Sequence, residues 1–285
     1  MFYYLEYFLV SGVITLANLL PLQFSYWLAK RIGDLSYFIM AKRRKIALEN
    51  IARAYGANLS LKRKKEIARR SFEHIALSIT ELFTTPRILK NASQKFSLEG
   101  ISHLDAALTK GKGILLVVSH VGSWEYLAFL SYFREYHLSV VVKTLKNDLV
   151  DCIMNKFREK TFLHPIPKRE SARKILYEIH RNHIVAILID QWAGDEGIRT
   201  EFFGSETSTT SIPARLAEKT GCALIPAYCL RKEGGRYEIH IEAPLDWDAQ
   251  DPHWEHGVTQ KLNQRLERQI LENPEQWLWG HRRWK

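Results

Sequence analysis

The segment ILLVVSHVGSWE, residues 114–125, decides the fold that we expect for this chain. Its first six residues are apolar or small and predict a buried β-strand, with His120 at the carboxyl end. Gly122 and Ser123 then permit a turn, and Ser123 suits the N-cap of a following helix. The segment therefore predicts a strand, a turn and a helix, with a histidine at the turn.

Strands and helices continue to alternate along the rest of the chain. Apolar runs predict strands at 114–119, 138–142, 184–189, 223–228 and 237–242. Amphipathic segments predict helices at 123–136, 148–160, 170–181, 212–220 and 254–272. This order is typical of a single α/β domain with a mostly parallel sheet flanked by helices. In such sheets, active sites lie beyond the carboxyl ends of the strands.

The chain before residue 97 has a different character. No charged residue occurs in residues 7–29, which are numerous enough to span a bilayer, although Pro21 would break or kink a helix there. This stretch predicts a kinked transmembrane anchor or a helix lying in one leaflet, and a buried N-terminal helix is the alternative. We therefore divide the chain into a membrane-associated segment (1–29), a basic helical part (30–96) and an α/β core (97–285).

The net charge of +10 is concentrated near the apolar N-terminus. Residues 30–73 contain thirteen Lys or Arg and four Asp or Glu. A basic block beside an apolar segment suits anionic lipid headgroups, and the positive-inside rule places the rest of the chain on the cytoplasmic side. A solvated basic surface without a partner is the alternative. Nucleic-acid binding would rest on charge alone, so we expect no nucleic acid as a partner.

His120 and Glu125 form an H-x4-E pattern that suits general-base chemistry. Five positions within one helix would separate the two side chains by about 140°, so they meet only if His120 lies in the loop. A neutral imidazole accepts a proton from an attacking hydroxyl, while a carboxylate on its other nitrogen fixes the tautomer. Backbone N–H groups at the helix start suit an anion. A packed histidine beside a helix-stabilising glutamate explains the spacing equally well.

Other kinds of site lack support in the sequence. There is no HExxH motif and no G-x-S-x-G nucleophile elbow, so we expect neither a metal site nor a serine nucleophile. The cysteines form no CxxC pair, and the histidines outside the motif show no ligand spacing. These residues are Cys152, Cys222 and Cys229, and His103, His137, His164, His180 and His183.

Five blocks, in order, resemble the lipid A biosynthesis (late) acyltransferases, a branch of the lysophospholipid acyltransferase superfamily. They cover nearly the whole chain: SHVGSWE (119–125), NDLVDCIMNKFRE (147–159), IVAILIDQ (184–191), EFFGSETSTTSIPARLAEKTGCALIPAY (201–228) and NPEQWLWGHRRWK (273–285). The resemblance implies His120 as the catalytic base with Glu125 as its partner. It maps the family's arginine to Arg158 and its acidic residue to Asp190.

Physical roles can be set beside these positions. The guanidinium of Arg158 suits the binding of a phosphate or of a thioester-carrier group, and a surface salt bridge is the alternative role. Asp190, followed by Gln191, would orient Arg158 or a substrate hydroxyl, or else be a turn residue. Thr210 and Ser211 precede a helix, where their hydroxyls suit a headgroup phosphate or a plain cap. The tryptophans of the last block suit structural closure or interfacial anchoring.

The resemblance implies an O-acyltransferase on the cytoplasmic face of a bacterial inner membrane. It would move a fatty acyl chain from acyl carrier protein or CoA to a hydroxyl of a lipid A precursor, with no cofactor beyond this co-substrate. Departures from the family pattern at Asp148, Trp192 and residues 194–200 leave the acceptor open. A lysophospholipid, a mannosylated phosphoinositide or an aminolipid is the nearest alternative, and a non-catalytic lipid-binding protein is the alternative of another class.

Overall fold

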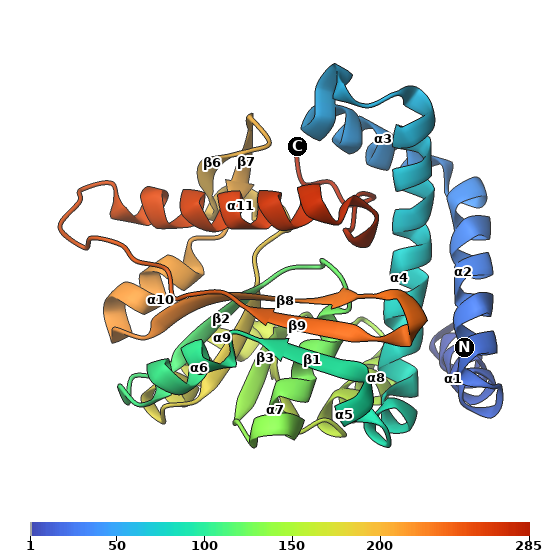
Figure 1. Cartoon of the computed structure of the whole chain (residues 1–285), viewed down its shortest axis with the longest axis horizontal. Coiled ribbons are helices and arrows are strands. Elements are labelled where there is room, and N and C mark those ends of the chain that lie inside the picture. The colour runs from blue at the N-terminus through green and yellow to red at the C-terminus, as the bar shows by residue number, and fades with distance from the viewer. Residues whose placement is uncertain (1) are drawn as a thin grey trace.

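A seven-stranded sheet forms the centre of the computed structural model, which describes residues 2–285 (Figure 1). Its strand order is β1-β9-β8-β2-β5-β3-β4, and every neighbouring pair is parallel except β8 with β9. A separate antiparallel hairpin joins β6 to β7. The strands are β1 (Phe96–Glu99), β2 (Ile114–Val118), β3 (Leu138–Val142), β4 (Leu163–Pro167), β5 (Ile184–Leu188), β6 (Ile198–Phe202), β7 (Ser205–Thr209), β8 (Ala223–Arg231) and β9 (Tyr237–Ile241). The expected α/β fold with a mostly parallel sheet flanked by helices is confirmed.

The described residues also form eleven α-helices. They are α1 (Phe2–Leu19), α2 (Leu22–Ile39), α3 (Ala41–Tyr55), α4 (Leu61–Leu89), α5 (Ala92–Lys95), α6 (Ile101–Leu108), α7 (Phe129–Arg134), α8 (Asp148–Glu159), α9 (Ser171–His180), α10 (Ile212–Thr220) and α11 (Trp254–Glu272). The long helix α4 stands at one end of the sheet, with α2 alongside it (Figure 1).

The central strand β2 shows why the sheet is buried on both faces. All five of its residues are buried, and successive side chains point to opposite faces of the sheet. Leu116 and Val118 join a core that includes side chains of α6 and α7. Leu115 and Val117 join a second core with α9, α10 and α11. A continuous apolar run is what a strand covered on both faces requires.

The N-terminal apolar stretch forms two helices, because Pro21 separates α1 from α2 as its position predicts. Helix α1 has the length and composition of a helix that crosses a membrane, and only 6% of its 18 residues are buried inside the protein. It is nevertheless fastened to the protein: the Asn147 side chain donates to the carbonyl of Tyr3, and Arg87 donates to the carbonyls of Ala17 and Leu20. Helix α2 continues past residue 29, where we placed a segment boundary.

Several elements differ from the sequence prediction. Strands β1, β4, β6 and β7 were not predicted; β4 contains Pro165 and Pro167, which an edge strand tolerates because it needs fewer backbone donors. The predicted helix at 123–136 is divided into a 3₁₀-helix, η2 (Trp124–Ala128), and the short α7. Ser123 occupies the N-cap position of η2, as predicted, but its side chain makes no cap hydrogen bond.

The C-terminal block closes the structure rather than anchoring it at an interface. Trp277 and Trp279 are 1% and 0% exposed, and Trp284 is also buried. The Asn50 side chain of α3 donates to the carbonyls of Trp279 and His281, at 2.9 and 2.7 Å. Of the two roles left open for these tryptophans, the structure therefore shows structural closure.

Gly33 permits the close contact between α2 and α4, and its replacement gives a test of that contact. A Cβ atom at Gly33 would lie 2.5 Å from Cα of Glu73, whereas a Cβ at Gly12 of α1 meets nothing within 4 Å. We expect Gly33→Ala to lower the free energy of unfolding by about 1–3 kcal/mol, because the helices must move apart. Denaturant unfolding of the purified protein measures the change.

Gly12→Ala is the matched control, since it adds the same methyl group to an exposed helical position. It should leave the stability unchanged or raise it by up to about 1 kcal/mol through helix propensity. Equal effects of the two substitutions would show that the α2–α4 contact does not depend on Gly33.

Candidate functional site

His120 and Asp190 lie side by side because the two strands that precede them are neighbours. His120 follows β2 and Asp190 follows β5, and these strands pair in parallel. Nδ1 of His120 is 2.8 Å from Oδ1 of Asp190, and the backbone N–H of His120 donates to Oδ2 at 3.0 Å. The Asp190 residue is 2% exposed, whereas 18% of the His120 side chain remains exposed. The histidine is therefore the member of the pair that a substrate can reach.

The electrostatics of the pair favour a proton on Nδ1. Burial lowers the pKa of His120, but the charge and hydrogen bond of Asp190, together with the charge of Glu125, raise it more, so the net shift is upward. Burial raises the pKa of Asp190, but the charge and hydrogen bonds of His120 and the hydrogen bond of Trp277 together hold it well below its usual range. The ionised carboxylate thus fixes the tautomer, and Nε2, which makes no hydrogen bond within residues 2–285, is the nitrogen that can accept a proton.

Trp277 holds the other side of this carboxylate. Its indole Nε1 donates to Oδ2 of Asp190 at 2.9 Å. The carboxylate thus accepts from the ring and the backbone of His120 and from the indole. With these three donors its orientation is fixed.

Glu125 lies at the site but has a different partner from the predicted one. Its carboxylate accepts two hydrogen bonds from Arg158 of α8, at 3.0 Å from Nε and 2.7 Å from Nη2. The carboxylate on the imidazole is therefore supplied by Asp190 rather than by Glu125. The prediction that Asp190 orients Arg158 is corrected in the same way, since Glu125 does so. The charge of Glu125 still contributes to raising the pKa of His120, after the larger effects of burial and Asp190.

The turn after His120 is held by backbone contacts. Gly122 has φ +63°, and a Cβ there would lie 2.0 Å from the carbonyl oxygen of Cys229. The N–H of Gly122 donates to the carbonyl of Gln276, and that of Ser123 donates to the carbonyl of Cys229. These two donors are therefore already used, and an anion at this turn would have to be held by other groups.

A cavity of about 1050 Å³ opens beside His120. It is slightly larger than the roughly 300–1,000 Å³ typical of small-molecule sites. Apolar side chains from α4, β2, β3 and β5 form much of its wall: Ile79, Leu82, Val118, Leu138, Val140, Ala186 and Leu188. Basic side chains also line it, at Lys143, Arg158, Lys168 and Arg215. Such a cavity can hold an apolar chain together with an anionic group.

The other predicted site residues also lie at this cavity. Gln191, Thr210 and Ser211 line it, as do Arg158 and Glu125. Thr210 Oγ1 accepts only a long contact from the N–H of Ile212, at 3.4 Å, so capping explains little of its position. The fold thus brings together His120 and all the predicted residues around it, with Asp190 behind the histidine.

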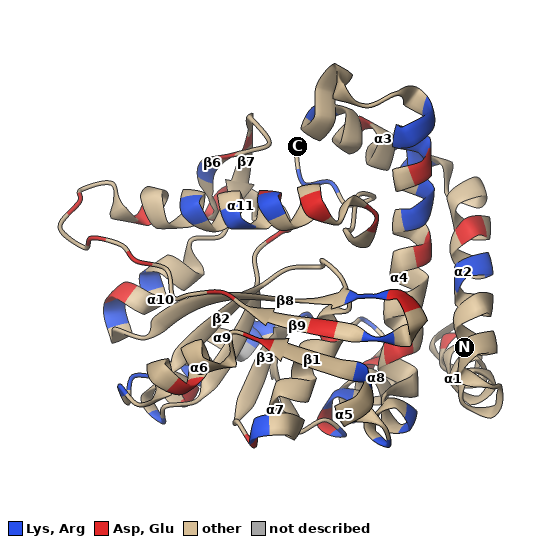
Figure 2. Cartoon of the chain, viewed as in Figure 1, with Lys and Arg blue, Asp and Glu red and all other residues tan. Residues whose placement is uncertain are grey.

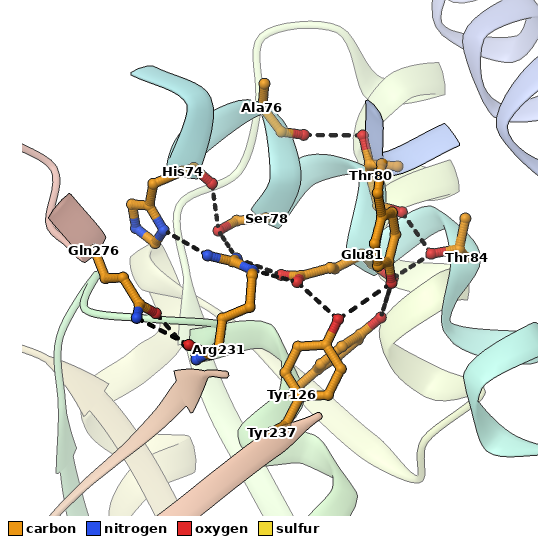
Figure 3. A network of polar contacts seen from close by, with 11 residues as sticks. His74, Ala76, Ser78, Thr80, Glu81, Thr84, Tyr126, Arg231, Tyr237 and Gln276 are labelled. Atoms are coloured by element: carbon orange, nitrogen blue, oxygen red, sulfur yellow. Dashed lines mark hydrogen bonds and ion pairs between the residues drawn. The ribbon is translucent and has the colours of Figure 1, made fainter. Parts of the chain in front are cut away.

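A buried polar network joins α4 to β8 and β9 (Figure 3), and it reaches the His120 turn through His74. Glu81 accepts from Nε and Nη2 of Arg231, at 2.6 and 2.7 Å, and from the Tyr237 hydroxyl at 3.0 Å. Nη1 of Arg231 lies 3.2 Å from Nδ1 of His74. Arginine can only donate, so His74 Nδ1 accepts and its Nε2–H points to the carbonyl of His120, 3.3 Å away. Burial, and then the charge of Arg231, lower the pKa of His74, which keeps this ring neutral.

Sequence reasoning missed Trp277, His74 and Arg231 as parts of this site. Each lies far from His120 in the chain, and none belongs to a short motif with a known chemical role. The only sequence signal was the position of Trp277 in the C-terminal block NPEQWLWGHRRWK. Arg283 of the same block is 0% exposed and donates to the carbonyl of Gln191, which holds the loop after β5.

Comparison with known proteins matches residues 1–285 to a family model described as bacterial lipid A biosynthesis acyltransferase. Two proteins of Escherichia coli strain K12, a lipid A biosynthesis palmitoleoyltransferase and a lipid A biosynthesis lauroyltransferase, are 25% and 24% identical to the chain. Both alignments cover 96% of this chain and 89% of the relative. A phosphatidylinositol mannoside acyltransferase of Mycobacterium tuberculosis is 29% identical over 182 residues, which are 62% of this chain. This alignment spans only 56% of the mycobacterial protein.

The buried pair of Glu81 and Arg231 gives a stability prediction. Glu81→Gln would leave the Arg231 guanidinium buried without its counter-charge, and we expect a loss of about 3–5 kcal/mol in the free energy of unfolding. Glu206→Gln is the matched control, because Glu206 pairs with Arg199 on the surface, where both side chains are 68% exposed. That control should change stability by less than about 1 kcal/mol. Similar losses in denaturant unfolding of the two variants would contradict the structural role of Glu81.

Proposed function

Because the chain belongs to the bacterial lipid A biosynthesis acyltransferase family, we propose that it transfers a fatty acyl chain to a lipid hydroxyl, with His120 as the general base. The donor is an acyl thioester of acyl carrier protein or CoA, and the acceptor is a lipid A precursor. The observation that carries this proposal is the His120–Asp190 pair at the edge of a large, mainly apolar cavity.

The proposed reaction follows from the tautomer of His120. Nε2 takes the proton of the acceptor hydroxyl as its oxygen attacks the thioester carbonyl, and the imidazolium that forms is stabilised by Asp190. The tetrahedral intermediate then collapses, the carbon–sulfur bond breaks, and the thiolate takes the proton back from His120. The products are an ester and a free thiol, and the histidine returns to its starting state.

We assign to Arg158 the role of stabilising the negative charge that develops in this reaction. Its guanidinium has five N–H groups, of which two donate to Glu125 and one to Asn155. Two N–H groups therefore remain for the oxyanion or for a phosphate of the carrier. Glu125 holds the guanidinium in the cavity wall, which gives this carboxylate a positioning role rather than the role of base partner.

The apolar wall of the cavity is the proposed site of the acyl chain. Burying a hydrocarbon chain there is favourable by about 0.8 kcal/mol for each methylene group. Thr210, Ser211 and Gln191 lie at the same cavity and are the proposed contacts for polar groups of the substrates. The thioester and the acceptor hydroxyl would then meet beside His120.

Exposed apolar side chains on α1 and α2 support a membrane-bound location, which we place on the cytoplasmic face of the inner membrane. Their exposed fractions are 67% for Phe8, 62% for Leu9, 52% for Trp27 and 64% for Phe38. Figure 2 shows that charged residues are sparse on these helices compared with α3 and the start of α4. A large exposed apolar surface in one region marks a membrane or protein interface, and a lipid acceptor favours the membrane.

A mannosylated phosphoinositide is the second candidate for the acceptor. It is favoured by the 29% identity to the mycobacterial phosphatidylinositol mannoside acyltransferase. The chemistry of the base, the thioester and the hydroxyl is the same for both acceptors.

Mass spectrometry of lipids from a bacterial host tests the reaction, with wild type and His120→Ala compared. We expect wild type to add one acyl chain to lipid A, and His120→Ala to lower turnover by at least about a hundredfold because the base is lost. A new acylated phospholipid or phosphoinositide would support acyl transfer and show that the acceptor is this lipid rather than lipid A.

The control is the amount of each variant in the membrane fraction, since His120 is not one of the exposed apolar side chains of α1 and α2. His120→Ala should fractionate with membranes as wild type does. Full activity in a folded, membrane-bound His120→Ala variant would overturn the assignment of the base. Membrane binding without any acylated product from wild type would favour a lipid-binding protein.

A further inference from the structure

Three histidines that are scattered in the sequence meet at the edge of the sheet opposite to His120. His137 directly precedes β3 and His183 directly precedes β5. These two strands are parallel neighbours, so their amino ends lie together, while His120 and Asp190 are at carboxyl ends. His164 belongs to β4, the next strand along the sheet. The cluster is therefore separate from the candidate active site.

A single carboxylate joins two of these rings. Oε2 of Glu178, in the last turn of α9, lies 2.6 Å from Nδ1 of His183 and 3.1 Å from Nε2 of His137. The rings of His137 and His183 stack with their centroids 3.9 Å apart, and His164 stacks on His137 at 4.2 Å. His137, Glu178 and His183 are half-buried, so the group is ordered by packing and still reachable by an ion.

We propose that His137, Glu178 and His183 bind a divalent transition-metal ion, for which Zn²⁺ is the best match. Two imidazole nitrogens and one carboxylate oxygen, with water in the fourth position, form a common open zinc site. One ligand atom from each of the three residues lies within 4.8 Å of the others. With bonds of about 2.0–2.2 Å, tetrahedral ligands lie roughly 3.3–3.6 Å apart. The two contacts to Glu178 therefore need to widen by about 1 Å or less.

The place of the cluster in the fold indicates what the ion would do. It would connect the segment before β3 to the short connection between α9 and β5, where Glu178 and His183 are only five residues apart. An ion that binds the folded state and not the unfolded chain stabilises the fold by mass action. The inference is thus a metal ion that joins these segments through three protein ligands, and it does not depend on the proposed acyl transfer.

Equilibrium dialysis of the full-length, untagged protein against micromolar Zn²⁺, followed by metal analysis, is the first test. We expect close to one zinc per chain, and a tetrahedral visible spectrum when Co²⁺ is used instead. His137→Ala, His183→Ala and Glu178→Gln should each weaken binding by about a hundredfold, since each removes one of three ligands. The melting temperature of wild type should rise by about 5 °C in excess zinc, and that of the variants should not.

His180→Ala is the matched control, because His180 is an exposed histidine on the same helix, α9. It should bind zinc and respond to it as wild type does. Absence of zinc and of a cobalt spectrum in wild type would overturn the proposal. Zinc retained by all three ligand variants would also overturn it, since the ion would then be adventitious on surface histidines. If one variant fails to fold, the other two variants and the wild-type cobalt spectrum still decide whether these residues bind the ion.

Discussion

An ionised carboxylate at the end of β5 lies almost entirely out of water, and Asp190 therefore needs hydrogen-bond donors from the protein. It finds them in the ring and backbone of His120 and in the indole of Trp277. Losing any one donor would leave a buried charge undersatisfied, which is costly in a low-dielectric interior. This requirement links β2, β5 and the C-terminal block at one point. It also fixes the histidine in the tautomer that general-base chemistry uses.

The second buried pair, Glu81 with Arg231, serves the same turn from the opposite side. Burial and the charge of Arg231 keep His74 neutral, and the contact with Arg231 directs the other ring nitrogen at the carbonyl of His120. The turn is thus held through Asp190 on one side and through α4 on the other. The cavity needs such rigidity, because a base placed about 1 Å from its productive position loses much of its effect. The apolar helices α1 and α2 lie next to α4, so the proposed membrane surface and the site share one support.

Much of this arrangement could be read from the sequence, and the rest depends on long-range pairing. Alternating apolar runs and amphipathic segments predicted the α/β fold and put His120 at a strand end. The pairing of His120 with Asp190 rather than Glu125 depends on β5 lying next to β2, which no local pattern reveals. Trp277 is 87 positions from Asp190, so its role was equally hidden. The short or proline-containing strands β1 and β4 gave too weak a pattern to predict.

The pH dependence of single-turnover acyl transfer by Asp190→Asn and Glu125→Gln tests the central assignment most directly. Asp190 raises the pKa of His120, and the base must be neutral, so the wild-type rate falls as the pH drops through this raised pKa. Asp190→Asn should lower the plateau by about a hundredfold or more and move the acidic limb to lower pH. Glu125→Gln should move that limb less. A larger shift in Glu125→Gln than in Asp190→Asn would show that Glu125, and not Asp190, is the partner of the base.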